Sequence, residues 1–173
     1  VLGFGMIASA KEMVLVLVGD QWLPCVPMLQ IVSLNMILYP IHSLNLNMLQ
    51  VSGRSDLFLK LEIVKKCIAV IPILCGIFGN IYLMLWVGFI TGGCIDFFLN
   101  SFYSGKFINY SPLQQIKDVI PGCLVAITMA VPVFLLSLLP LSCIIIFPLQ
   151  LLVGSILVII ISEMIGSPEY QEI

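Results

Sequence analysis

Apolar residues fill six long blocks of the chain, and short polar segments separate these blocks. The blocks cover residues 1–18, 26–49, 61–78, 81–103, 119–139 and 141–164. A helix needs roughly 20 apolar residues to cross the hydrocarbon core of a bilayer, and most of the blocks approach or exceed this length. The pattern therefore predicts an all-α integral membrane protein, a bundle of six transmembrane helices of which the first is truncated.

Composition supports a membrane location. The chain is 61% hydrophobic and 9% charged, with a mean hydropathy of +1.18, whereas about 25% of the residues of a soluble domain are charged. The net charge is -2, and the few charged residues are spread between the apolar blocks. A nucleic-acid partner is therefore not expected, and the lipid bilayer is the expected surrounding.

The beginning of the chain indicates a longer protein. The sequence begins at Val1 without a Met, a charged leader or a small-residue cleavage site, so no signal peptide is visible. We expect residues 1–173 to form a single transmembrane domain, the C-terminal part of a longer protein.

Reactive side chains form no recognisable catalytic or metal-binding pattern. The six cysteines are scattered without a close pair, so the sequence predicts neither a zinc site nor a disulfide framework. A Ser/His/Asp trio, paired loop carboxylates and a glycine-rich phosphate cradle are also missing from the pattern. We expect no enzyme activity, no metal and no cofactor.

Basic residues favour one orientation, because cytoplasmic loops of membrane proteins collect Lys and Arg. They fall between the second and third blocks and between the fourth and fifth, at Arg54, Lys60, Lys65, Lys66, Lys106 and Lys117. That face, with an expected polar loop at Ser104 to Asp118, should be cytoplasmic, and so should the C-terminus. Arg54 and Lys60 are candidates for lipid phosphates at the inner surface, although topology alone also explains them.

The second block has a polar face. At 100° per residue, Asn35, His42 and Asn45 share one sector of the helix, with Gln30 at its margin. Such a sector is costly to expose to lipid, so it should face a cavity or hydrogen-bond to other helices. His42 is either structural or part of a transport route.

Two charged positions fall inside apolar blocks. Lys11 lies about 12 Å below the corner at Gly19; it either attracts an anion in a polar cavity or reaches water along its own stem. Its neighbour Glu12 does not face it. Asp96 lies roughly 10 Å from the cytoplasmic end of its block, so proton or cation coupling competes with contact to headgroup water or a lysine.

Several short motifs, taken together, resemble a known family. These are Gly19-Asp20-Gln21-Trp22, the proline-broken polar helix, Ser43-Leu44-Asn45-Leu46-Asn47-Met48-Leu49-Gln50, Gly53-Arg54-Ser55-Asp56 with Leu59-Lys60-Leu61-Glu62, and Tyr103-Ser104-Gly105-Lys106 with the Gln114 to Asp118 run. The chain resembles the polysaccharide transporter family, the Wzx-type O-antigen and exopolysaccharide flippases of the multidrug/oligosaccharidyl-lipid/polysaccharide flippase superfamily.

The resemblance implies a transporter of two six-helix lobes in the bacterial cytoplasmic (inner) membrane, with this chain as the second lobe. The cargo would be a polyprenyl-diphosphate-linked oligosaccharide, a lipopolysaccharide or other polysaccharide precursor. In the implied central cavity, Lys11 would attract the diphosphate, and amides beside His42 would bind sugar hydroxyls. The expected partners are the missing N-terminal lobe and polysaccharide assembly proteins. Cavities in this family are often more cationic than these residues suggest.

Three alternatives remain open. Cation-coupled drug exporters belong to the same superfamily. A membrane enzyme, such as a polymerase or acyl transferase, usually carries a large outer loop, and the outer corners here are short. A non-transporting scaffold would tolerate apolar replacements in the second block.

Overall fold

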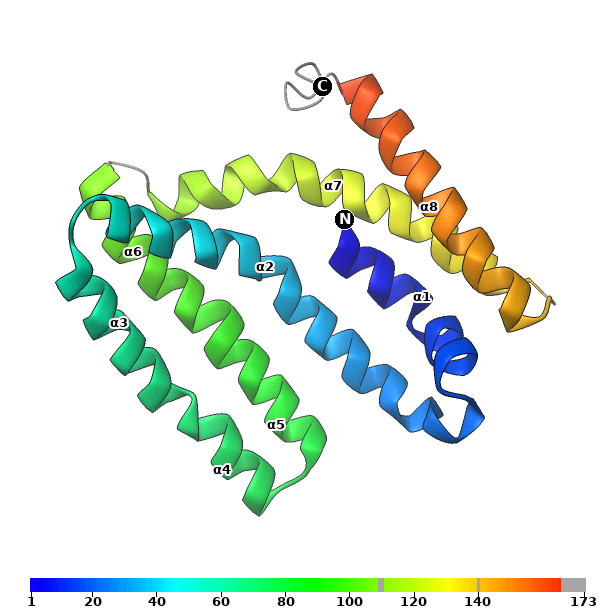
Figure 1. Cartoon of the computed structure of the whole chain (residues 1–173), viewed down its shortest axis with the longest axis horizontal. Coiled ribbons are helices and arrows are strands. Elements are labelled where there is room, and N and C mark those ends of the chain that lie inside the picture. Colours follow the sequence, from blue (N-terminus) through cyan, green and yellow to red (C-terminus); the bar gives the residue numbers. More distant parts are fainter. Residues whose placement is uncertain (109–110, 140, 166–173) are drawn as a thin grey trace. The chain divides into compact units, whose positions relative to one another are not determined.

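The computed structural model describes residues 1–108, 111–139 and 141–165, and this part of the chain is helical without strands (Figure 1). The elements are α1 (Leu2–Leu17), the 3-10 helix η1 (Asp20–Cys25), α2 (Val26–Val51), α3 (Ser55–Ile68), α4 (Val70–Phe78), α5 (Ile81–Gly88), the π-helix η2 (Phe89–Ile95), α6 (Asp96–Ile108), α7 (Pro112–Leu136) and α8 (Cys143–Ile165). The predicted all-α class is confirmed for these residues.

Four helical segments of the described chain are long and apolar enough to cross a membrane. They are Asp20–Val51, Ile81–Gly105, Pro112–Leu136 and Cys143–Ile161. Helix α1 has 16 residues, and α3 and α4 are separate, so neither region is among the four. The helices are those of a multi-pass membrane protein.

Contacts within the chain divide it into two compact units. Unit 1 comprises Val1–Ser33 and Val119–Ile173, and unit 2 comprises Leu34–Asp118. In unit 1, α1 packs against α8. A small core forms there around Ala8, Met129 and Val133.

Unit 2 is built on two helical pairs that lie side by side. Helix α4 packs on α5, and α3 packs on α6 (Figure 1). The corner between α4 and α5 is tight: Asn80 caps α5, its Oδ1 accepting a 2.8 Å hydrogen bond from the Leu83 amide. An amide side chain at this position satisfies a donor that the first helical turn leaves free.

The third apolar block differs from the expected helix at 61–78. Helix α3 begins earlier, at Ser55, and the helix is interrupted at Ala69 before α4 begins. Pro72 explains the interruption, because its ring clashes with the carbonyl four residues earlier, at Ile68, and it has no N–H to donate there.

The predicted polar loop from Ser104 to Asp118 is wrong. Helix α6 continues to Ile108, and α7 begins at Pro112. Ser111 and Gln114 form a reciprocal cap: the Gln114 amide donates to Ser111 Oγ at 3.3 Å, and the Ser111 amide donates to Gln114 Oε1 at 2.9 Å. With proline in the first helical position, this cap starts α7 seven residues before the expected block.

Gly88 and Gly92 face other helices without tight contact. An added Cβ at Gly88 would lie 3.9 Å from Pro72 of α4, and one at Gly92 would lie 3.9 Å from Asn35 of α2, both ordinary van der Waals distances. The chain between them adopts the π-helix η2, a widened turn that is frequent at functional sites.

Several expectations fall on residues that the structure does not describe. We expect a corner at Pro140, between the fifth and sixth apolar blocks, and a short acidic tail after Pro168, and both lie outside the described residues, as does the side chain of Lys106. The cytoplasmic C-terminus stays a prediction, as does the single domain of residues 1–173.

Candidate functional site

Residues of the polar face of α2 contact the long helix of residues 81–108 at successive positions along its length. Asn35 lies against η2, its Oδ1 being 3.2 Å from where a Cβ on Gly93 would stand. Further along, His42 contacts Asn100 and Asn45 contacts Ser101. Residue numbers increase in the same direction along both helices at these contacts, so the two helices run parallel, as Figure 1 shows. The predicted polar sector of α2 therefore lies on the helix-packing face within unit 2.

Asn45 is the centre of this buried network. Its Nδ2 donates to Gln115 Oε1 at 2.8 Å and to Ser101 Oγ at 3.1 Å, while its Oδ1 accepts from Ser104 Oγ at 2.9 Å. Ser101 also donates to Gln115 Oε1, at 2.8 Å. One side chain of α2 thus links α6 to the first turns of α7.

His42 extends the network toward η2. Its Nδ1 lies 3.3 Å from Asn100 Nδ2, and its ring packs edge-on against Phe97, with ring centroids 6.3 Å apart. Asn100 Nδ2 can only donate, so Nδ1 of the neutral ring accepts and the ring proton is assigned to Nε2. His42 therefore presents an N–H donor on its other side.

Three atoms of the network make no hydrogen bond of good geometry among the described residues: His42 Nε2 (although the Gly93 backbone lies near the ring), Asn100 Oδ1 and Gln115 Nε2. Their residues are 9%, 1% and 4% exposed. Leaving such an atom unpaired costs about 1–3 kcal/mol, so native proteins usually satisfy it with protein, water or ligand. Two donors and one acceptor are a set that hydroxyl groups can satisfy, because a hydroxyl both donates and accepts.

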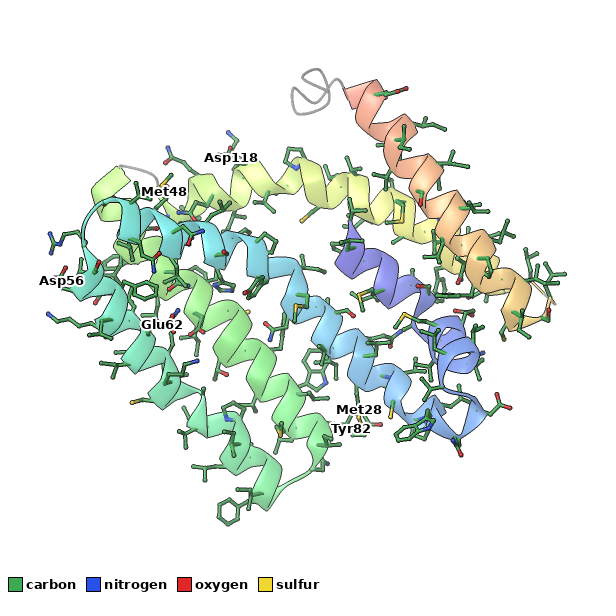
Figure 2. All side chains as sticks on the ribbon, in the orientation of Figure 1. Met28, Met48, Asp56, Glu62, Tyr82 and Asp118 are labelled. Carbon is green, nitrogen blue, oxygen red and sulfur yellow. The ribbon has the colours of Figure 1, made fainter. Side chains whose placement is uncertain are left out.

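A second polar cluster lies beside η2. Asp96 and Lys65 line the same pocket of about 120 Å³, with Thr91 and Gly92. Lys65 forms an ion pair with Glu62 on its own helix, α3; Figure 2 labels Glu62 and, near the first turn of that helix, Asp56. Asp96 Oδ1 is buried without a hydrogen-bond partner in the described structure. Two carboxylates, those of Glu62 and Asp96, thus lie near the ammonium groups of Lys65 and Lys66.

Lys11 and Gln30 belong to unit 1 and are not joined to this network by any described contact. Lys11 is exposed on α1, whereas Glu12 is 3% exposed, consistent with their pointing apart. Gln30 Nε2 donates to the Ile7 carbonyl at 3.3 Å and lines an apolar pocket of about 330 Å³. A common cavity for Lys11, Gln30 and the α2 sector stays a prediction.

Arg54 and Lys60 are exposed at the beginning of α3. Arg54 Nε lies 3.3 Å from Asp56 Oδ1. Hydrogen bonding to the Arg54 guanidinium lowers the pKa of the Asp56 carboxyl below its ordinary value of 3.8. Binding of lipid phosphates to Arg54 and Lys60 stays a prediction. Within the described chain, His, Cys, Asp and Glu side chains form no group of three or more that could hold a metal ion.

Sequence reasoning missed half of the network. Ser101, Ser104 and Gln115 were assigned to the fourth block's end and the loop after it. Their signal was present: Asn100-Ser101 and Ser104 recur at helical spacing, and the sequence Ser111-Pro112-Leu113-Gln114 is typical of a helix start.

No family model matches the chain, and no curated protein or solved structure matches it either.

Proposed function

We propose that this chain is one lobe of a membrane flippase that moves a lipid-linked oligosaccharide across the bacterial cytoplasmic membrane. The observation that carries the proposal is the buried network of His42, Asn45, Asn100 and Gln115 in helices otherwise suited to lipid. Polar side chains within membrane helices are costly, and their usual roles are substrate paths and ion sites.

The unpaired atoms favour a polyhydroxylated cargo. His42 Nε2 and Gln115 Nε2 donate, and Asn100 Oδ1 accepts, so neighbouring sugar hydroxyls would satisfy all three. The network is uncharged, which suits the sugar part of the cargo. The anionic diphosphate needs a cation, and Lys11 on α1 is our candidate for it, as the resemblance to Wzx-type flippases implies.

The helices contain features that suit alternating access. Pro40 lies inside α2 and Pro121 and Pro132 lie inside α7, while η2 interrupts the long helix with a π turn. Proline and π turns loosen backbone hydrogen bonding and mark places where membrane helices bend. We propose six spans in the complete lobe, with α1 and the α3–α4 pair as the remaining two, and a cytoplasmic C-terminus. Transport would then occur by rocking of this lobe against a second one.

A transport assay tests this proposal. The full-length protein in vesicles should translocate a labelled lipid-linked oligosaccharide, and Asn100→Leu should slow translocation by about tenfold or more, since it removes the partner of His42 and an unpaired acceptor. Asn47→Leu, a substitution at an exposed position of α2, the helix that carries His42, should leave the rate unchanged. Lys11→Ala should also reduce transport. Absence of translocation by the wild-type protein would overturn the proposal.

A second candidate is a cation-coupled exporter of organic cations, favoured by the pocket beside Asp96. One oxygen of that carboxylate is buried and unpaired in the described structure, and a carboxylate inside a membrane span commonly binds a proton or cation. Asp96→Asn should abolish cation efflux if this candidate holds. If Asp96→Asn leaves oligosaccharide translocation intact and no organic cation is exported, the candidate is excluded.

A further inference from the structure

Unit 1 contains a pocket of about 400 Å³ between α1, α7 and α8. This volume is in the range of small-molecule sites, which are mostly apolar with a few placed polar groups. Its walls are formed largely by Met, Val, Leu, Ile and Phe side chains, and the polar side chains in the lining are Ser9, Gln150 and Ser155. Neither acidic nor basic side chains line it.

Each of the three polar side chains donates one hydrogen bond to a main-chain carbonyl of the protein. Gln150 Nε2 donates to the Val133 carbonyl at 3.1 Å, Ser9 Oγ donates to the Gly5 carbonyl at 2.9 Å, and Ser155 Oγ donates to the Leu151 carbonyl at 2.7 Å. Each hydroxyl has a single hydrogen. The pocket therefore has no side-chain hydroxyl hydrogen left to offer a ligand.

Acceptors remain available in the same place. Gln150 Oε1 is buried and has no hydrogen-bond partner in the described part of the chain, and the residue is 2% exposed. The oxygens of Ser9 and Ser155 keep lone pairs after donating. A ligand that satisfies Gln150 Oε1 must donate a hydrogen bond, and a ketone, ester or ether cannot do so.

We infer that this pocket binds a neutral long-chain alcohol of the membrane, whose hydroxyl donates to Gln150 Oε1. The apolar chain lies along the methionine-rich wall formed by Met6, Met13 and Met129, since unbranched, polarizable Met side chains adapt to irregular apolar partners. This site lies in unit 1, separate from the polar network of unit 2, and it does not depend on the proposed transport function.

Photolabelling in reconstituted vesicles tests the inference. The probes are a diazirine-bearing hexadecanol and its methyl ether, which has the same chain but no hydroxyl donor. The alcohol should label Met129 or its neighbours about threefold to tenfold more than the ether at equal concentration, the difference that one net hydrogen bond makes. Equal labelling by the two probes would overturn the inference, because the pocket would then bind the alkyl chain without any preference for a hydroxyl group.

Two variants test whether Gln150 is the residue that binds the hydroxyl group. Gln150→Leu should abolish the preference for the alcohol while ether labelling persists, and the matched control Gln50→Leu, at an exposed position on α2, should keep the preference. Persistence of the preference in Gln150→Leu would assign the hydroxyl to another site and contradict the inference. Since the wild-type ratio is measured independently, a Gln150→Leu protein that fails to fold does not decide the outcome.

Discussion

Asn45 and Gln115 are hydrogen-bonded at 2.8 Å although 70 residues separate them in the chain. The bond joins the C-terminal end of the polar face of α2 to the first turn of α7. It is buried within a set of helices whose other surfaces are largely apolar. Long-range polar pairing of this kind holds membrane helices in register, because lipid offers no competing partner.

Removal of Asn45 tests the structural weight of the network. Asn45→Leu leaves Ser104 Oγ and Gln115 Oε1 with fewer partners, so the free energy of unfolding should fall by about 1–3 kcal/mol. The measurement is reversible unfolding in detergent micelles or bicelles. Asn47→Leu is the control, since Asn47 is exposed on the same helix. Equal losses in both variants would show that the network contributes nothing specific.

The corner between α4 and α5 leaves no space for a side chain at Gly79. A Cβ there would stand 2.8 Å from the Cys75 carbonyl oxygen and 2.8 Å from Leu83 Cδ2. Gly79→Ala should therefore lower the free energy of unfolding by about 1–3 kcal/mol. Gly122→Ala in α7 meets nothing within 4 Å and should be neutral or stabilising by up to about 1 kcal/mol. A Gly79→Ala protein as stable as wild type would contradict this description of the corner.

The Arg54–Asp56 pair predicts a pH effect of defined sign. Because the guanidinium lowers the pKa of Asp56 in the folded protein, the carboxylate's contribution to stability is present above its unfolded pKa, near 4, and is lost as the pH falls through the lower folded pKa. An NMR titration of Asp56 should give a lower pKa in wild type than in Arg54→Gln. Identical titrations in the two proteins would contradict the pairing.

Orientation is tested by epitope insertion. A tag inserted after Gly53 should be accessible only from the cytoplasm, since the basic residues follow it. A tag inserted after Gly79, in the corner between α4 and α5, should be accessible only from outside. If antibodies reach both tags from the same side of the membrane, the α3–α4 pair does not cross the bilayer, and the six-span proposal is wrong.

The helical class and the polar side of α2 could be predicted because both depend on local periodicity. Apolar block lengths predict helices, and a 100° rotation placed Asn35, His42 and Asn45 on one face. The partners of that face could not be found in this way. Gln115 comes near Asn45 only through the packing of helices that are distant in the sequence. The periodicity within either segment does not predict this contact.

The sequence pattern predicted two local features wrongly, the interruption at Ala69 and the helix start at Ser111, because composition over a longer stretch suggested something else. The apolar run through Pro72 hid the interruption at Ala69, and the polarity around Ser111 suggested a loop although polar caps are how helices begin. The assignment of Lys11 to the same cavity as His42 has a different basis, the resemblance to Wzx-type flippases, and depends on the arrangement of whole lobes.

Aqueous access to the polar face of α2 tests the central proposal most directly. In a full-length protein with its native cysteines replaced by serine or alanine, His42→Cys and Leu44→Cys are compared in vesicles with a water-soluble thiol reagent. Leu44 is 65% exposed on the apolar surface of the same helix. The account predicts that the cysteine at position 42 reacts, that lipid-linked oligosaccharide protects it, and that the cysteine at position 44 stays unreactive. An unreactive position 42, or a reaction that the oligosaccharide does not slow, would contradict the proposal that polar cargo meets this face.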